Sequence, residues 1–462
     1  MCGLEPRGAA ARGRSANMKI EGNGFDGRAL MRKGWVGAWP VLEQFAGPIA
    51  QFLLTPLLLL RMDPHQFALW ILAQSLVVAA PTLSFGQSAA LLAVLPRYSG
   101  EQRDAAAVAF LRATLRLIAV NAALAAVLVI GLRAALSALS VSLEPTLLYL
   151  LSVLALLVVT DLESMLSSVL KSYGFFHQSA WVEVGGRVAQ VALTIAIIES
   201  GSSGTTAVLL VVATGVIKVM IKFGLVASRL RTAHPRTADL DNHQRVLQMR
   251  VLGIWNWINV LSGVLFYTFD RWAVGYFLGS TALAAYAVCN QLAQLTHSVP
   301  AAASQTLIPW AAARVHSTGR EAALPLIRRV AWVSSLAAIV PALALIALAP
   351  YVLSLWISPQ FSQEHSGLLR HLGIVFLLLS LNVPSFNLML GIGKPRVAAL
   401  VGLFAGIIYS TATLLLRPSS LATMVNLKLL YGVLALACIP LLTQVLKGLA
   451  SDELIPPVRE IR

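Results

Sequence analysis

Long uninterrupted apolar runs are the feature that most limits how this chain can fold. Two of them are LLYLLSVLALLVVT (147–160) and AWVSSLAAIVPALALIALAP (331–350). Each lies within a span of about 20 residues, the length of helix that crosses the roughly 30 Å hydrocarbon core of a bilayer. Because lipid offers the backbone no hydrogen-bond partner, such a span has to be helical. Only 12% of the residues are charged, against about 25% in a soluble domain. The sequence therefore predicts an all-α polytopic membrane protein.

Twelve such spans can be placed along the chain, six on each side of its longest polar interruption. They are expected near residues 35–60, 67–95, 113–135, 147–170, 179–199, 206–228, 251–276, 282–308, 328–350, 368–391, 397–416 and 427–447. We predict a six-helix half over 34–228, a cytoplasmic linker over 229–250 and a second six-helix half over 251–447. The flanking segments 1–33 and 448–462 are expected to be a disordered cytoplasmic N-terminus and a cytoplasmic tail. Translation from Met18 is an alternative to a start at Met1.

The distribution of basic residues predicts how the spans are oriented. The formal net charge is +15. With the N-terminus inside, 28 of the 35 Lys and Arg residues fall on the cytoplasmic side and five on the other. Such an excess is typical of the cytoplasmic side of membrane proteins, so both termini are expected in the cytoplasm. The basic charge is thereby assigned to orientation and to contact with anionic membrane lipids rather than to nucleic acid.

The sequence lacks the common motifs for metal, disulfide or nucleotide chemistry. Cys2, Cys289 and Cys438 are far apart and form no CxxC pair, so neither a disulfide framework nor a zinc site is expected. No GxxxxGK[ST] sequence occurs, which argues against ATP hydrolysis by this chain. The short loops leave no room for a separate catalytic domain. We therefore expect no cofactor and no enzymatic activity.

Two pairs of similar segments indicate that the halves are repeats. Residues 168–197 resemble 387–416, and residues 67–76 resemble 283–292. Both pairs are separated by about 216 to 220 residues, as a single repeat of six spans requires. Parallel repeats in transporters are related by an axis along the membrane normal, with the substrate site between them. Chance similarity between apolar helices is the alternative.

Polar side chains form a stripe on each of two neighbouring spans. The stripes consist of Asn256, Asn259, Gly263, Tyr267 and Asp270 on the seventh span and Asn290, Gln294, His297, Ala301 and Gln305 on the eighth. Spacings of three and four residues place each set on one face of its helix. Two such faces favour a water-filled cavity. Hydrogen bonding between packed helices is the alternative.

Charged residues within the spans are candidates for contact with a substrate or an ion. Arg187 is deep in the fifth span, and its planar fork suits a phosphate. Glu183, four residues earlier, would compete by pairing with it. Lys218 and Lys222, near the inner end of the sixth span, could attract an anionic head group or extend to the interface. Asp161 and Glu183 are the candidates for taking up a coupling cation.

Asp270 and Arg271 are expected near the outer end of the seventh span. Asp270 lies 19 residues after residue 251, which corresponds to about 28 Å of helix. The pair is expected to anchor this helix end or to close an outer gate, with direct substrate contact as the alternative. Adjacent residues of a helix point in different directions, so the two charges are not expected to neutralise each other.

Residues 266–312 resemble the seventh and eighth helices of bacterial polysaccharide flippases of the Wzx type. The likeness is carried by Asp270-Arg271, Gly275, Gly279 and the run Tyr286-Ala287-Val288-Cys289. Residues 62–91 are similar to the second helix of that family. The turns SYGFFHQ (172–178) and GIGKPR (391–396) fit the places where those proteins re-enter the membrane. These flippases belong to the multidrug/oligosaccharidyl-lipid/polysaccharide exporter superfamily.

The resemblance implies two six-helix bundles around a central cleft, as in MATE transporters. It also implies an oligosaccharide on polyprenyl diphosphate as substrate, flipped across the bacterial cytoplasmic (inner) membrane by alternating access. A polysaccharide polymerase and glycosyltransferases would be its partners. Such flippases often carry several cations in the cavity, whereas the sequence identifies only Arg187, with Lys218 and Lys222 near the mouth. The alternatives are a cation-coupled multidrug exporter of the same fold and, less favoured by the short outer loops, a membrane-bound polysaccharide polymerase or ligase.

Overall fold

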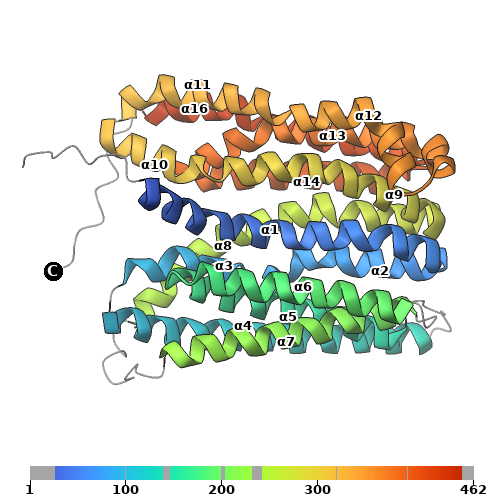
Figure 1. Ribbon diagram of the computed structural model, residues 1–462, viewed down its shortest axis with the longest axis horizontal. Coiled ribbons are helices and arrows are strands. Elements are labelled where there is room, and N and C mark those ends of the chain that lie inside the picture. Colours follow the sequence, from blue (N-terminus) through green and yellow to red (C-terminus); the bar gives the residue numbers. More distant parts are fainter. Residues whose placement is uncertain are drawn as a thin grey trace, which may run out of the picture.

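The computed structural model describes residues 27–98, 100–138, 146–198, 203–230, 242–318, 320–392 and 394–449. Nearly all residues in these ranges are helical, and none of them forms a strand. The helices lie roughly parallel along the long axis of the molecule (Figure 1). The all-α prediction is therefore confirmed for the part of the chain that the structure describes.

The first half contains six passes, and only the second of them is broken into short pieces. Its elements are α1 (Gly27–Arg61), α2 (Pro64–Leu76), η1 (Val77–Thr82), α3 (Gln87–Val94), η2 (Leu95–Arg97), α4 (Gly100–Ala138), α5 (Leu147–Ser172), α6 (Phe176–Ile198) and α7 (Gly204–Leu230). The second pass runs from α2 to η2. It is interrupted because Pro81 lies inside η1 and Gly86 has a φ of 69°, a left-handed conformation that suits glycine.

The second half repeats this arrangement with breaks at other places. Its elements are α8 (Asn242–Tyr267), α9 (Phe269–Ser304), α10 (Leu307–Thr318), α11 (Arg320–Ala338), α12 (Val340–Trp356), α13 (Pro359–Gly391), α14 (Pro395–Leu416), α15 (Leu421–Ala435) and α16 (Cys438–Leu449). The chain turns at Gly279, whose φ of 86° is not helical. The seventh pass therefore consists of α8 and the start of α9, and the eighth is the rest of α9. The ninth pass is α11 with α12, and the twelfth is α15 with α16.

Two of the predicted boundaries are wrong where the structure describes them. α1 begins at Gly27, inside the segment expected to be disordered, and α8 begins at Asn242, inside the expected linker. Apolar periodicity marks only the buried part of a helix, so a polar extension at its end is missed. Residues 1–26, 231–241 and 450–462, which include Met18 and most of the predicted tail, lie outside the described residues.

Corresponding helices of the two halves pack in the same pairs. The first pass packs against the fifth in one half (α1 with α6), as the seventh packs against the eleventh in the other (α8 with α14). Likewise α5 packs against α7, and α13 packs against α15. This equivalence is what a repeat of six spans requires. Figure 1 shows most helices of the first half in blue and green below those of the second half in orange and red.

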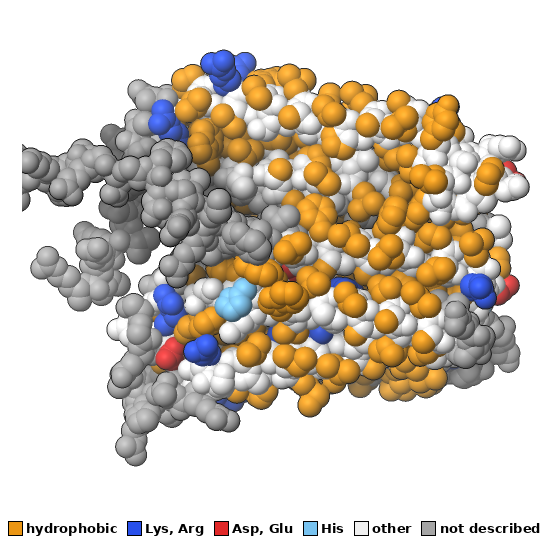
Figure 2. Space-filling model, in the orientation of Figure 1, with side chains coloured by type: hydrophobic (Ala, Val, Ile, Leu, Met, Phe, Trp, Pro, Cys, Tyr) orange, Lys and Arg blue, Asp and Glu red, His pale blue; other side chains and the backbone are white. Residues whose placement is uncertain are grey.

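The outer surface of the bundle carries an apolar band. Within the described residues, nine helices are long and apolar enough to cross a membrane. Large side chains such as Leu128 on α4 and Leu355 on α12 are exposed on it. Figure 2 shows hydrophobic side chains spread over the middle of one face. Because a soluble protein does not expose apolar patches of this size, the band faces lipid, and the chain is a multi-pass membrane protein.

The two halves meet on the side expected to face the cytoplasm, which we call the inner side, and on the opposite, outer side. On the inner side, the rings of Phe85 and Trp257 are 5.4 Å apart, and the Asn256 side chain donates a hydrogen bond to the Gly86 carbonyl oxygen (3.2 Å). On the outer side, the rings of Phe52 and Trp356 stack with their centres 4.7 Å apart. We call these contacts the inner seam and the outer seam.

Candidate functional site: a cavity between the halves

A cavity of about 200 Å³ lies between the two seams. α1, α2, η1 and α6 line it from the first half, and α8 and α9 line it from the second. Its polar lining residues are Gln51, Gln74, Ser75, Arg187, Arg271, Gln291, Gln294 and Ser298. Arg187 lies 11 residues from each end of α6, or about 17 Å at 1.5 Å per residue. The cavity is therefore near the middle of the membrane.

Amide side chains hold the cavity wall together through hydrogen bonds. The Gln51 amide donates to the Gln74 side-chain oxygen (3.4 Å), which links α1 to α2. The Thr55 hydroxyl donates to the Gln291 side-chain oxygen (2.7 Å), which links α1 to α9 across the two halves. Amides can both donate and accept, so the same groups can also bind the hydroxyls of a polar ligand.

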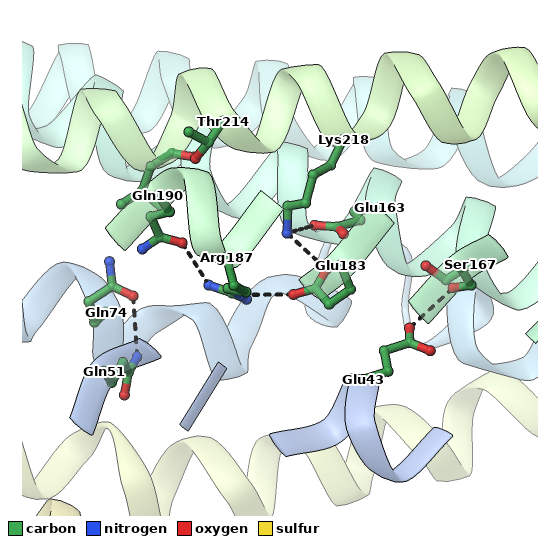
Figure 3. A network of polar contacts seen from close by, with 12 residues as sticks. Glu43, Gln51, Gln74, Glu163, Ser167, Glu183, Arg187, Gln190, Thr214 and Lys218 are labelled. Carbon is green, nitrogen blue, oxygen red and sulfur yellow. Dashed lines mark hydrogen bonds and ion pairs between the residues drawn. The ribbon is translucent and has the colours of Figure 1, made fainter. Parts of the chain in front are cut away.

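Arg187 reaches the cavity from α6. Its Nε donates to the Glu183 carboxylate (2.8 Å), and its Nη1 donates to the Gln190 side-chain oxygen (3.0 Å). Figure 3 shows the guanidinium extending from α6 toward the glutamine pair. The pairing of Arg187 with Glu183, one of the two alternatives expected from the sequence, is therefore present, and binding of a phosphate by Arg187 stays a prediction. Nε is bound to the carboxylate, and the residue still lines the cavity.

Behind Arg187, two lysines and two glutamates form a buried network inside the first half. Lys218 is 2.7 Å from the Glu163 carboxylate and 2.9 Å from that of Glu183. Lys222 is 2.7 Å from Glu163, and its ammonium group also donates to the Ser167 hydroxyl (2.8 Å). With Arg187, the network holds three cations against two carboxylates, an excess of one positive charge.

The expectation that Lys218 and Lys222 lie at the cavity mouth or extend to the interface is wrong. Their side chains are 7% and 1% exposed. They turn inward because Glu163 on α5 and Glu183 on α6 face them at hydrogen-bond distance. Gly186 makes room for this packing, since a Cβ there would lie 2.3 Å from the Lys218 side chain. Glu183 is thereby a member of the network rather than a free carboxylate.

Asp161 does not join this network. It is fully buried on α5, and its Oδ1 accepts a hydrogen bond from the Ser84 hydroxyl (3.0 Å). Its other oxygen has no hydrogen-bond partner among the described residues. Uptake of a coupling ion by Asp161 stays a prediction.

Asp270 and Lys428 form a second buried charge site, in the second half. Both side chains are fully buried and in direct contact. Asp270 also accepts from the Tyr286 hydroxyl (2.7 Å), and Lys428 donates to the Asn290 side-chain oxygen (2.9 Å). The Lys428 ammonium lies 4.4 Å from the centre of the Phe266 ring, which adds a cation–π contact.

This site corrects two expectations. Asp270 is not at the outer interface, because the seventh pass continues to the turn at Gly279, nine residues further on and about 14 Å along the helix. Lys428 is not an outer flanking residue, because α15 begins at Leu421 and not near 427. The pair thus joins α9 to α15 inside the second half, so it neither anchors an exposed helix end nor lines the cavity.

Arg271 points away from Asp270 and lines the cavity, as the different directions of adjacent helix residues predict. Its Nε is buried and has no hydrogen-bond partner in the part of the chain that the structure describes. The cavity therefore has a guanidinium from each half, Arg187 and Arg271. The expectation that Arg187 would be the lone deep cation is wrong.

The polar stripes of the seventh and eighth passes are divided between the two predicted roles. Gln294 lines the cavity. Asn256 joins the halves at the inner seam, and Asn290 binds Lys428 inside the second half. His297 packs against Phe376 of α13, with ring centres 6.1 Å apart. Asn259 is half-buried and is not among the residues lining this cavity.

Several residues of the cavity and of the charge sites were not proposed as site residues from the sequence, although Gln51 and Glu163 are polar residues within predicted spans. Gln51, Gln74 and Gln291 line it, and Lys428 and Glu163 complete the two charge sites. The available signal was weak, since a polar residue within a span does not show which cavity or partner it faces. Lys428 alone carried a misleading signal because it lies close to a span end in the sequence.

Two family models match the chain. The model described as polysaccharide biosynthesis protein matches residues 36–315, more than half of the chain, and the MatE model matches residues 257–411. No curated protein sequence matches the chain.

Solved structures of similar fold come from the MATE group. An inward-facing multidrug resistance MATE family transporter of the MOP superfamily has a TM-score of 0.66 at 12% identity, with 89% of this chain and 96% of that chain covered. A MATE structure in complex with MaL6 has a TM-score of 0.63 at 16% identity, with 90% of this chain and 96% of that chain covered. A MATE structure in the straight conformation has a TM-score of 0.63 at 14% identity, with 92% of this chain and 97% of that chain covered. The predicted MATE-like fold is confirmed, and the chain belongs to the family described as polysaccharide biosynthesis protein.

Proposed function

We propose that this protein flips an oligosaccharide linked to polyprenyl diphosphate across the bacterial cytoplasmic membrane for surface polysaccharide biosynthesis. The observation that carries the proposal is the presence of Arg187 and Arg271 in one cavity between the halves. Guanidinium groups bind phosphate oxygens through paired hydrogen bonds. The surrounding glutamines suit sugar hydroxyls. Glycosyltransferases would supply the substrate, and a polysaccharide polymerase would use the product.

The sign of the cavity charge favours this substrate over a cationic drug. None of the described residues lining the cavity is Asp or Glu. The nearest carboxylates belong to Glu183, which is paired with Arg187 and Lys218, and to Asp270, which is paired with Lys428. A cation in this cavity would meet two guanidiniums and no free carboxylate, so it would be repelled.

The size of the cavity indicates that the halves must separate during transport. Its volume of about 200 Å³ is below the roughly 300–1,000 Å³ of typical small-molecule sites. An oligosaccharide is larger still. We infer that this conformation is closed at both seams, and that the head group enters when the inner seam opens and leaves when the outer seam opens. The polyprenyl chain stays outside the central cavity throughout.

The test uses the full-length protein in proteoliposomes that contain a lipid-linked oligosaccharide. We expect Arg271→Ala and Arg187→Ala each to slow translocation of the sugar head at least tenfold, which corresponds to a loss of about 1.4 kcal/mol of stabilisation. Arg370→Ala, which removes an exposed arginine of α13, is the control and should transport normally. Arg271→Lys should recover part of the rate by restoring the charge.

The same proteoliposomes distinguish the rival function. Efflux of a cationic dye by the wild-type protein, together with no movement of the lipid-linked sugar, would refute the proposal in favour of a multidrug exporter. Normal sugar transport by both alanine variants would remove the two arginines from the substrate site.

A further inference from the structure

A second hollow on the molecule meets the central cavity at Arg187. It is a groove of about 440 Å³ between α1 and α6. Its walls are apolar side chains of α1 between Leu42 and Leu53 and of α6 between Val184 and Ile195. Leu42, Ile49, Leu53 and Val188 are each more than half exposed. The groove therefore opens onto the surface that faces lipid.

Among the described residues that line the groove, Arg187 alone is charged, and it lines the central cavity as well. Its guanidinium passes beside α1 at Gly47, where a Cβ would be 3.8 Å from the guanidinium carbon. Gly47 also lines the cavity. The groove and the cavity thus lie on two sides of the contact between α1 and α6, with Arg187 lining both.

We propose that this groove holds the polyprenyl chain of the substrate while its diphosphate contacts Arg187 and its sugar occupies the central cavity. The inference rests on the proposed function and assigns the lipid half of the ligand. An occupant has to be apolar along the groove to match its walls. It is favoured to be anionic where it meets Arg187, because the buried network of Arg187, Lys218, Lys222, Glu163 and Glu183 has one more cation than carboxylates. A polyprenyl diphosphate meets both conditions.

The shape of the groove suits a single hydrocarbon chain rather than the many lipid chains of a bilayer leaflet. Its walls are two helices in contact, and residues 42 to 53 of α1 cover about 17 Å. The groove extends along both helices on either side of Arg187. The tail can therefore follow the groove toward either leaflet while the diphosphate remains beside the same guanidinium.

Photolabelling of the full-length protein in proteoliposomes tests the assignment. The probe is polyprenyl diphosphate with a diazirine in the half of the tail nearer the diphosphate. We expect it to label peptides from residues 42–53 and 184–195 several-fold more than other lipid-facing helices. A phosphatidylcholine that carries the same diazirine should not show this preference. Equal labelling by both probes would mean that the groove holds ordinary membrane lipid, which would overturn the proposal, and so would preferential labelling of another face.

Two matched substitutions link the groove to transport. Ala192→Phe fills the groove from α6, whereas Ala123→Phe places the same ring on the exposed face of α4. We expect the first to reduce both photolabelling and translocation several-fold and the second to change neither. Ala46→Phe, on the α1 wall of the groove, should act like Ala192→Phe, so the test does not depend on one variant being well folded.

The outcome also separates this inference from the proposed function. If the wild type moves the lipid-linked sugar and the Ala192→Phe and Ala46→Phe variants, monodisperse in detergent, move it equally fast, the groove assignment is wrong and the flippase proposal stands. If the wild type does not move the lipid-linked sugar at all, the proposed function fails first.

Discussion

Asp270 and Lys428 depend on each other because both are fully buried. Removing a charge from water costs several kcal/mol, and the attraction between two buried ions offsets this only while both are present. The Tyr286 hydroxyl and the Asn290 amide supply further hydrogen bonds to the pair. At the scale of single residues, we therefore assign this site to the stability of the second half.

Lys428→Met should destabilise the protein strongly, because it leaves the Asp270 carboxylate buried without its partner. We expect a loss of about 3–5 kcal/mol, seen as a large drop in the thermal unfolding temperature of the protein in detergent. The double variant Asp270→Asn/Lys428→Met removes both charges and should recover most of the loss. If the double variant were as unstable as Lys428→Met alone, the loss of stability would not come from leaving the Asp270 charge unpaired.

A more exposed pair provides the control for this prediction. Lys171 lies 3.0 Å from the Glu43 carboxylate, with side chains 21% and 13% exposed. Lys171→Met should cost much less, on the order of 1 kcal/mol or below, because water still reaches both groups.

At the scale of secondary-structure elements, the inner seam depends on close approach of α8 to the turn before α3. A Cβ on Gly86 would lie 2.6 Å from the Gly253 carbonyl oxygen, and a Cβ on Gly253 would lie 2.9 Å from that of Phe85. Gly86 also has a left-handed backbone, which costs any other residue conformational energy. These two glycines allow the halves to touch at the inner seam.

Gly86→Ala and Gly253→Ala should each weaken the inner seam. We expect a destabilisation of about 1–3 kcal/mol from overpacking, measured as a lower unfolding temperature in detergent, together with faster reaction of a cysteine placed at Phe85 with a water-soluble thiol reagent. Gly224→Ala on α7 is the control, because a Cβ there meets nothing within 4 Å. Equal stability of all three variants would mean that the contact at the seam is loose.

At the scale of the whole molecule, the transport that we propose requires that the inner and outer seams open in turn. The Phe85–Trp257 ring pair closes one side, and the Phe52–Trp356 pair closes the other. A carrier that alternates between two states cannot complete its cycle if either seam is held shut.

Cross-linking either seam should therefore stop net transport. Cysteines are introduced at Phe85 and Trp257, or at Phe52 and Trp356, after the native cysteines Cys2, Cys289 and Cys438 are replaced by alanine. A short bifunctional thiol reagent with a reducible bond should block translocation of the lipid-linked sugar in both double variants, and reduction should restore it. Each single-cysteine variant, treated in the same way, should transport. Transport by a cross-linked sample would show that its seam does not open in the cycle.

Much of the architecture could be read from the sequence because it follows from the solvent. A span of about 20 apolar residues has to be a helix in lipid, so the all-α class and the number of passes follow from counting such spans. The equivalent packing of α1 with α6 and α8 with α14 agrees with the repeat seen in the sequence. The predicted helix ends were less accurate, because the polar first residues of α1 and α8 carry no apolar pattern that marks them as helical.

The partners of individual charges could not be read in the same way. Lys428 lies 158 residues after Asp270, and Lys222 lies 59 residues after Glu163. Local spacing did identify the Glu183–Arg187 pair, because four residues make one turn of helix. It could not show that Arg271 faces the same cavity as Arg187, since that depends on how the two halves face each other.

The sequence by itself determined that the chain crosses a membrane many times as helices, and it predicted which basic segments face the cytoplasm and that two halves repeat. These properties depend on local hydrophobicity and charge, and lipid acts on each segment almost independently. Only the tertiary structure decided that Lys218, Lys222 and Lys428 are buried partners of carboxylates, and that two guanidiniums face one cavity. A charge in a low-dielectric interior is stabilised only by groups within a few ångströms, and those groups come from helices far apart in the sequence.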